Sequence, residues 1–170
     1  MPFLTPDQEA LVTHIAARLV ARRETVAVAE SSTGGLISAA LLWVAGASRY
    51  YAGGGVVYTL QSRTALAGVS AEEYKHYRGT TPEMLASLAE SMRLRLNATW
   101  AVAESGLAGP TGGRNGASAG RTTVSVAGPA PRAEMVETGS DDRGENMVAF
   151  TTLALRTLRD AIAAAPEPAN

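Results

Sequence analysis

The chain has 170 residues, enough for one domain with a buried core, and its formal net charge of −1 excludes the basic surface that nucleic-acid binding requires. It has no cysteine and only two histidines, which excludes a disulfide framework and leaves too few ligands for a structural zinc site, so no metal is expected. No signal-peptide pattern opens the chain and no apolar run is long enough to span a membrane, so we expect a cytoplasmic protein without membrane contact.

The first third of the chain alternates between helical and strand patterns. Thr5 begins a capping signature, and apolar residues then recur at helical spacing, which predicts a helix over residues 6–22. Residues 25–29 are a short apolar run and predict a strand, residues 34–44 predict a buried helix, and residues 56–58 predict a second strand.

The rest of the chain continues the same alternation. Its predicted elements are a helix at 82–96, strands at 100–103, 122–127 and 133–137, and a closing helix at 146–164.

This mixed order of helices and strands favours an α/β fold, a three-layer α/β/α sandwich with a mixed sheet. We find no internal repeat and no linker long enough to divide domains. A single domain over residues 1–165 is therefore expected, followed by a frayed, flexible tail at 166–170.

Two predicted strands end in segments rich in glycine and hydroxyl groups. The first strand runs into Glu-Ser-Ser-Thr-Gly-Gly at 30–35, and the strand at 100–103 is expected to break into a loop at Ser-Gly-Leu-Ala-Gly-Pro-Thr-Gly-Gly, 105–113. Glycines let backbone approach a ligand closely, and successive N–H groups bind anions. Either segment could be a solvated linker, but two such junctions together predict one shared site.

Ser31 is the candidate nucleophile at the first junction. It precedes a predicted helix, whose free N–H groups and partial positive charge would favour an oxyanion or a phosphate. Serine and threonine are also ordinary helix-capping residues, so Ser31, Ser32 and Thr33 could instead cap the predicted helix. Glu30 could orient Ser31, hold a ribose hydroxyl, or simply be exposed. Neither histidine, His14 or His76, completes a Ser-His-Asp triad with a visible motif.

Three blocks of the chain resemble a known family. In order and spacing, residues 29–35, 46–58 and 105–113 resemble the signature blocks of the CinA C-terminal domain family, named for competence-damage-inducible proteins, and the resemblance covers nearly the whole chain. Members are nicotinamide-nucleotide amidases, which convert the carboxamide of nicotinamide mononucleotide to the carboxylate and ammonia. The resemblance implies this fold and activity, a small-molecule nucleotide partner, no cofactor, and self-association into a homo-oligomer.

The resemblance also assigns catalytic roles. Ser31 falls on the serine that members use, and Ser32 stands where cysteine is usual. The lysine expected a few residues beyond Tyr58 corresponds to Arg63, which cannot act as a base but can bind phosphate. Tyr58 could relay a proton or donate to the carboxamide oxygen, or it could be a half-buried strand residue.

Other positions depart from the family pattern. Its Pro-Val-Gly-Thr segment corresponds to residues 118–121, where only the glycine is kept, and Met147 stands where an arginine is expected. Arg143 would then remain as the cation for a phosphate, with Arg63 or Arg121 as substitutes.

The expected substrate-binding residues come from all of these segments. Ser48 and Ser105 could bind the amide or the phosphate, or could stabilise turns, and the N–H groups of residues 33–35 or 105–109 would hold the oxyanion. The full set is Glu30, Thr33, Gly34, Gly35, Ser48, Ser105, Gly106, Ala108, Gly109, Gly112, Gly113 and Arg143.

Two other functions stay open beside the amidase. One is a nucleotide-binding module that has kept the pocket and lost the base, and the other is a purely structural partner protein. Arg63 best distinguishes the amidase from the nucleotide-binding module, because hydrolysis without a lysine needs another proton acceptor.

Overall fold

A computed structural model, which describes residues 3–77 and 79–168, contains one five-stranded sheet in the order β2-β1-β3-β4-β5. Strands β2, β1 and β3 run parallel, whereas β4 and β5 are antiparallel to their neighbours, so the sheet is mixed. The strands are β1 Val26–Glu30, β2 Tyr51–Val56, β3 Trp100–Leu107, β4 Arg121–Ala127 and β5 Arg132–Glu137.

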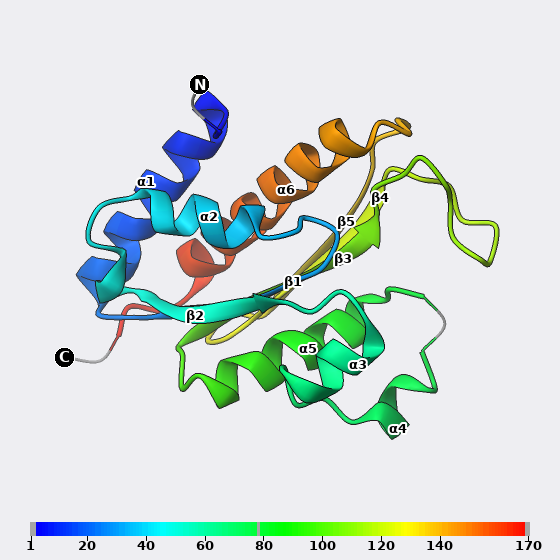
Figure 1. The fold of residues 1–170 in the computed structure, drawn as a ribbon. Coiled ribbons are helices and arrows are strands. Elements are labelled where there is room, and N and C mark those ends of the chain that lie inside the picture. Colours follow the sequence, from blue (N-terminus) through cyan, green and yellow to red (C-terminus); the bar gives the residue numbers. More distant parts are fainter. Residues whose placement is uncertain (1–2, 78, 169–170) are drawn as a thin grey trace.

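Helices cover both faces of this sheet (Figure 1). The helices α1, α2 and α6 lie on one face, and α3, α4 and α5 lie on the other, which is the predicted three-layer α/β/α sandwich. The helices are α1 Pro6–Arg22, α2 Leu36–Trp43, the 3₁₀ turn η1 Ala47–Arg49, α3 Leu60–Ala65, α4 Ala71–Tyr74, α5 Pro82–Arg95 and α6 Arg143–Ala164. Within the described ranges, no helix has the length and apolar character to cross a membrane.

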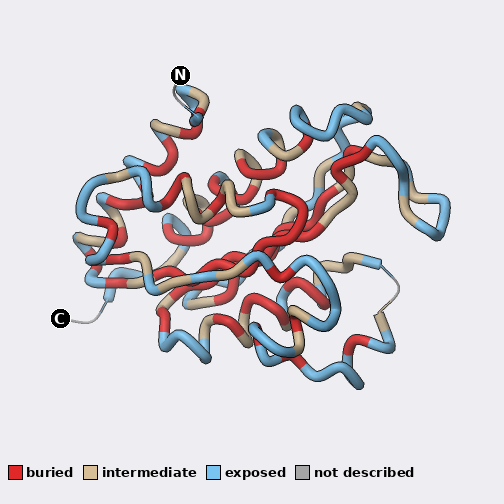
Figure 2. Tube along the Cα trace, viewed as in Figure 1, coloured by how far each residue is buried: buried red, intermediate tan, exposed pale blue. Residues whose placement is uncertain are grey.

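The core is divided by the sheet because β1 and β3 alternate large and small side chains. Val26, Val28 and Val102 face α1, α2 and α6 in one cluster. Ala27 and Ala101 belong to the second cluster, which packs against α5 and lets this helix approach the sheet closely. Strand β1 is buried along its whole length and β3 is buried as far as Ser105, as Figure 2 shows.

The second strand begins earlier than the sequence predicts. The prediction of a strand at 56–58 is wrong, because β2 comprises Tyr51–Val56 and contains three glycines. A Cβ at Gly54 would lie 2.6 Å from the carbonyl oxygen of Val28, so glycine is needed where the two backbones approach. Tyr58 therefore lies beyond the strand, and it is 59% exposed.

The third strand extends further than the sequence predicts. Ser105 and Gly106 do not open a loop, because they pair with Thr123 and Thr122 of β4 and β3 ends at Leu107. A Cβ at Gly106 would collide with the Arg121 carbonyl oxygen across the ladder. Glycine here serves close strand pairing rather than a turn.

The sequence does not predict the short helices, and the last helix begins three residues before the predicted start at residue 146. Asp142 caps α6 by accepting from the backbone N–H of Glu145 at 2.8 Å, which starts the helix at Arg143. Among the missed elements, α3 matters for the site because it carries Arg63. In the predicted tail, Glu167 pairs with Arg18 at 2.9 Å, and residues 169–170 lie outside the described ranges.

Candidate active site

The carboxyl ends of β1 and β3 bring the two predicted junctions together. These strands are parallel neighbours, with Val26 beside Trp100 and Ala29 beside Ala103, so both end at the same edge of the sheet. Ser31 follows β1 at this edge, and Ser105 lies near the end of β3. Pairing of the strands thus places side by side two segments that are far apart in the sequence.

One guanidinium joins the two serines. Arg63 extends from α3, and its Nη2 donates to Ser105 Oγ at 2.8 Å and to Ser31 Oγ at 3.4 Å. Its Nε donates to the Val57 carbonyl oxygen at 3.1 Å, and the side chain is buried. Three of the predicted residues therefore form one hydrogen-bonded group.

The charge of Arg63 determines what this group can do. Burial lowers the pKa of Arg63, but a guanidinium stays protonated in proteins. It can stabilise a negative charge on Ser31 Oγ and cannot take the serine proton. The single lysine of the chain, Lys75, is exposed and pairs with Glu72 at 2.6 Å.

A nearby phenol is also excluded as a base. Burial raises the pKa of Tyr74 to about 12, so this side chain is a neutral phenol near pH 7. Its hydroxyl donates to the Met84 carbonyl oxygen at 3.4 Å. Tyr74 therefore offers Ser31 no proton acceptor.

Glu104 is the central residue that the sequence analysis missed. It is fully buried, and it accepts from the backbone N–H groups of Ser31 at 3.2 Å and Thr33 at 3.1 Å. The hydroxyl groups of Ser32 and Thr122 donate to the same carboxylate, and the Thr33 hydroxyl oxygen, whose shorter contact is to Glu30, lies 3.1 Å from it. This carboxylate fixes the turn that presents Ser31. The signal in the sequence is an acidic residue directly after the apolar run of β3.

Glu30 has a structural role rather than the predicted one. Its carboxylate accepts from the N–H groups of Ile37 and Ser38, both at 3.0 Å, and from the hydroxyls of Thr33 at 2.7 Å and Ser38 at 2.6 Å. Glu30 therefore caps the start of α2 and does not contact the Ser31 side chain through these bonds. The positive end of this helix, expected to serve an anion at Ser31, faces the Glu30 carboxylate.

Some of the backbone N–H groups at 33–35, which are predicted to hold the oxyanion, already donate to acceptors within the fold. The Thr33 N–H donates to Glu104, and the Gly34 N–H donates to the Ser31 carbonyl oxygen at 3.1 Å. Gly35 precedes α2 in a left-handed conformation, with φ of 105°. Met147 lies over this turn, since a Cβ at Gly34 would be 3.2 Å from its Cε atom.

The start of α6 holds the glycine loop. Arg143 Nη1 donates to the Gly109 carbonyl oxygen at 2.8 Å, and Asn146 Nδ2 donates to the Ala108 carbonyl oxygen at 2.9 Å. A cavity of about 130 Å³ lies here, too small for a nucleotide. It is lined by Ser32, Tyr58, Gly106, Leu107, Ala108, Gly109, Thr111, Gly112 and Arg143.

Ser48 is not part of this group of residues. It lies in η1, just before β2, and Tyr51 at the start of β2 pairs with Val26 at the start of β1. Because β1 and β2 are parallel, Ser48 lies at the edge of the sheet opposite to Ser31. Its prediction as a residue of the same pocket is corrected by this register.

A larger cavity opens on the other side of the glycine loop. Its volume is about 480 Å³, within the range of small-molecule pockets. Thr123 lines it and pairs with Ser105, so it begins beside the serine pair. Its lining is Gly79, Thr80, Leu107, Gly113, Arg114, Asn115, Ala117, Arg121, Thr122, Thr123 and Met135.

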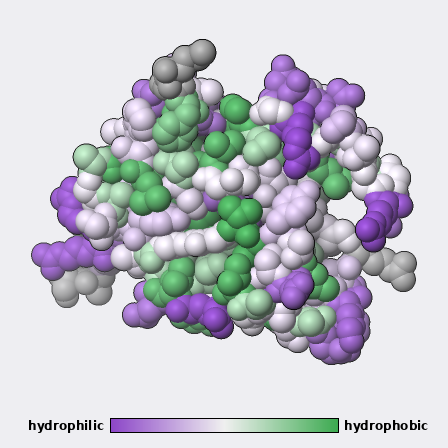
Figure 3. Space-filling view, in the orientation of Figure 1, coloured by the Kyte–Doolittle hydropathy of each residue, from purple (hydrophilic) through white to green (hydrophobic). Residues whose placement is uncertain are grey.

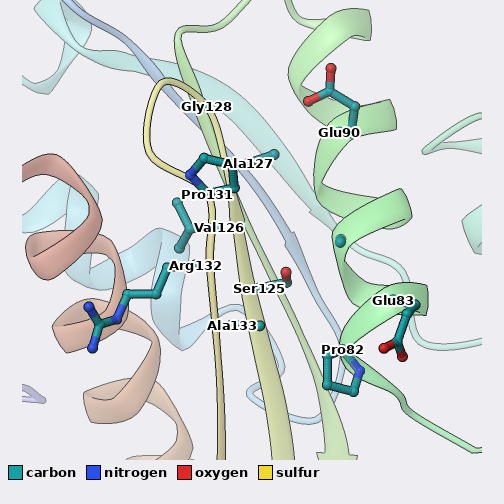
Figure 4. Close-up of a pocket in the computed structure, with 11 residues that line it drawn as sticks. Pro82, Glu83, Glu90, Ser125, Val126, Ala127, Gly128, Pro131, Arg132 and Ala133 are labelled. Atoms are coloured by element: carbon teal, nitrogen blue, oxygen red, sulfur yellow. The ribbon is translucent and has the colours of Figure 1, made fainter. Parts of the chain in front are cut away.

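A third cavity, of about 470 Å³, lies away from the predicted site residues. Figure 4 shows it between α5, which contributes Glu83 and Glu90, and the β4–β5 hairpin, which contributes Pro131 from its turn and Arg132 from the start of β5. Glu90 pairs with Arg93 at 2.7 Å, and Arg132 pairs with Glu134 at 2.8 Å. None of the residues predicted for the site lines this cavity.

The sequence matches one known family and resembles several proteins of that family. The model of the CinA C-terminal domain matches residues 8–162. A CinA-like protein of Desulfosudis oleivorans is 36% identical over 151 residues, which cover 88% of this chain and 37% of that protein. A CinA-like protein of Parasynechococcus marenigrum is 35% identical, and the matched segment covers 36% of that protein. The chain thus spans little more than a third of the length of these relatives.

Solved structures resemble the fold closely. A competence/damage inducible protein, CihA, from Agrobacterium tumefaciens superposes with a TM-score of 0.86 at 28% identity, covering 95% of this chain and 99% of that one. A CinA superfamily protein from Enterobacter cloacae gives a TM-score of 0.85 at 26% identity, with 95% of each chain covered.

Proposed function

The chain belongs to the CinA C-terminal domain family, and on that premise we propose that it hydrolyses the carboxamide of nicotinamide mononucleotide. The products would be nicotinic acid mononucleotide and ammonia. One observation carries the proposal: the Ser31 hydroxyl, at the carboxyl end of β1, is hydrogen-bonded to the buried Arg63 cation, which also binds Ser105.

In the proposed reaction, Ser31 Oγ attacks the carboxamide carbon. The tetrahedral intermediate collapses, its C–N bond breaks, and ammonia leaves with a proton from the medium. The acyl group then stands on Ser31 as an ester, which water cleaves to the free acid. Arg63 stabilises the negative oxygen of the attacking serine, and no metal or organic cofactor takes part in these steps.

The serine proton has to leave to hydroxide or to a water molecule, because Arg63 cannot accept it. We therefore expect a slow reaction whose rate increases with pH above neutrality. A serine activated by a neutral lysine would instead reach a plateau once that lysine is deprotonated.

A second candidate function is a nucleotide-binding module without turnover. The observation that favours it is the direction of the bond between Arg63 and Ser31, in which the arginine donates. The single lysine, Lys75, is paired with Glu72 elsewhere on the surface. The same pocket would then bind a pyridine mononucleotide and release it unchanged.

Ammonia release from nicotinamide mononucleotide tests the first function. We expect Ser31→Ala to reduce release to the background rate, whereas Ser32→Ala, which removes a neighbouring hydroxyl bonded to Glu104, retains activity. Activity that survives in Ser31→Ala and is lost in Ser32→Ala would contradict the assignment of the nucleophile.

Arg63→Lys separates the two functions. If the chain lacks only a base, lysine should increase turnover by about 10²-fold or more, because general bases contribute at least that much. If the wild-type chain binds the nucleotide and releases no ammonia up to pH 9, and only the lysine variant does so, the binding module is the correct function.

A further inference from the structure

We propose that the cavity between the glycine loop and the start of α5 is a phosphate-binding subsite, in which Arg121 and Arg114 hold a phosphate monoester. The inference deepens the proposed function and rests on it for the identity of the nucleotide. The chemistry of the subsite itself is argued from the side chains that line the cavity.

Three parts of the fold build this cavity. Arg114 comes from the loop between β3 and β4, Arg121 begins β4, and Thr80 lies directly before the cap of α5. Leu107 of β3 and Met135 of β5 supply apolar walls. Such a combination of an apolar wall and a cationic end suits a flat ring joined to an anionic group.

The charged side chains among the described residues of the lining are all positive. Arg114 and Arg121 line the cavity, and no carboxylate stands among the described residues that line it. Glu137 contacts Arg121 Nε at 3.0 Å from the neighbouring strand, but it is 65% exposed. A guanidinium carries four further N–H donors on its two Nη atoms, enough for a phosphate in addition to this partner.

Two of the three threonine hydroxyl groups of the lining are already used within the fold. Thr122 Oγ1 donates to Glu104 at 2.7 Å, and Thr123 Oγ1 donates to the Thr80 carbonyl oxygen at 3.1 Å. These threonines therefore form a fixed wall, and the anion must be recognised mainly by the arginines. Arg143, the cation expected for this role from the sequence, donates one N–H to the Gly109 carbonyl oxygen and lines the smaller cavity rather than this one.

The subsite lies on the same face of the sheet as the reacting group. Ser105 and Thr123 are paired across β3 and β4, so their side chains project from the same face. Ser105 shares the guanidinium of Arg63 with Ser31. A nucleotide whose phosphate binds at Arg121 would thus extend its ring toward Ser105.

Calorimetric titration of the whole chain with four probes tests the inference. The probes are nicotinamide mononucleotide, nicotinamide riboside, adenosine monophosphate and adenosine. We expect each nucleotide to bind at least tenfold more tightly than its nucleoside. Arg121→Gln should abolish most of this difference, and Arg121→Gln with Arg114→Gln should abolish it entirely.

Arg132→Gln is the matched control. Arg132 also pairs with a glutamate, Glu134 at 2.8 Å, but lies at the opposite end of the β4–β5 ladder, so its loss changes the net charge equally without touching the cavity. It should leave the preference for phosphate unchanged. An equal loss in Arg132→Gln and Arg121→Gln would attribute the effect to overall charge and overturn the subsite.

The outcomes distinguish this inference from the proposed function. Phosphate-dependent binding of adenosine monophosphate that needs Arg121, without binding of nicotinamide mononucleotide, supports the subsite and removes the proposed substrate. Ammonia release that is unaffected by the double substitution supports the hydrolase and overturns the subsite. No preference for nucleotide over nucleoside in the wild-type chain also overturns it.

Discussion

Glu104 illustrates how much of the site depends on one buried carboxylate. One of its oxygens, Oε2, accepts from the N–H groups of Ser31 and Thr33, and the other, Oε1, accepts from the hydroxyls of Ser32 and Thr122. Backbone N–H groups can only donate, whereas hydroxyl groups rotate and can either donate or accept. Replacing Oε2 would therefore leave N–H groups without an acceptor, whereas the hydroxyl groups at Oε1 could turn and accept from a new donor.

We predict that Glu104→Leu destabilises the fold more than Glu104→Gln. Glutamine keeps an oxygen for the two N–H groups, and its amide can donate to hydroxyls that turn to accept. Leucine leaves two buried N–H groups unpaired, at a cost of about 1–3 kcal/mol each. Urea unfolding measures both variants, and equal losses would contradict this account of the carboxylate.

At the scale of elements, close strand pairing explains Gly106, which could be taken for a loop residue, but it does not explain Gly55. Gly106 faces the β4 backbone, so that a side chain would meet the Arg121 carbonyl oxygen and Thr122. Gly55, on the edge strand β2, has only Val57 Cγ1 at 3.9 Å near its Cβ position. Neither residue has a positive φ.

Gly106→Ala should therefore destabilise the chain by about 1–3 kcal/mol, as overpacking does in well-packed cores. Gly55→Ala is its control in another strand and should change stability by less than about 0.5 kcal/mol. Thermal unfolding followed by circular dichroism compares the two. Similar midpoints for both variants would show that β3 and β4 can separate at no cost.

Tyr74, which is buried at the end of α4, determines how the stability of the fold changes at alkaline pH. Burial raises the pKa of Tyr74 from 10.0 to about 12, so between these values the unfolded chain loses this proton and the folded chain keeps it. Stability should therefore decrease as pH rises through this window, and Tyr74→Phe should flatten the decrease. The free energy of unfolding, measured in urea from pH 9 upward, checks the difference between the two proteins.

At the scale of the whole molecule, one face exposes apolar groups along a sheet edge. Trp43 is 47% exposed and Val56 is 45% exposed, and Leu42, Leu60 and Leu96 are also exposed. Figure 3 shows apolar side chains over the middle of the face along which β2 runs. An unpaired edge strand beside apolar groups favours contact with another chain.

We predict from this face, and from the family resemblance, that the chain forms a homo-oligomer. Sedimentation velocity at micromolar concentration should give a mass above 17.6 kDa, and Val56→Lys should reduce it toward the monomer. Val148→Lys, which changes a 38% exposed valine on α6, should leave the mass unchanged. A wild-type monomer at these concentrations would contradict the prediction.

The sequence by itself determined the order of the strands and of the long helices, and the family. The helix predicted from the cap at Thr5 is α1, Pro6–Arg22, because capping and 3.6-residue periodicity are local properties. It also singled out Ser31 and Ser105, since glycine and hydroxyl groups after apolar runs are visible in the chain. The family match over residues 8–162 confirms the resemblance that these blocks carried.

Only the tertiary structure decided which residues meet. Strand register places Ser48 at the far edge and Ser105 beside Ser31, and no local pattern encodes register between segments so far apart. The roles of Glu30 and Glu104 depend on which N–H groups lie opposite each carboxylate. The phosphate role proposed for Arg121 depends on a cavity between loop and helix, which exists only after the chain has packed.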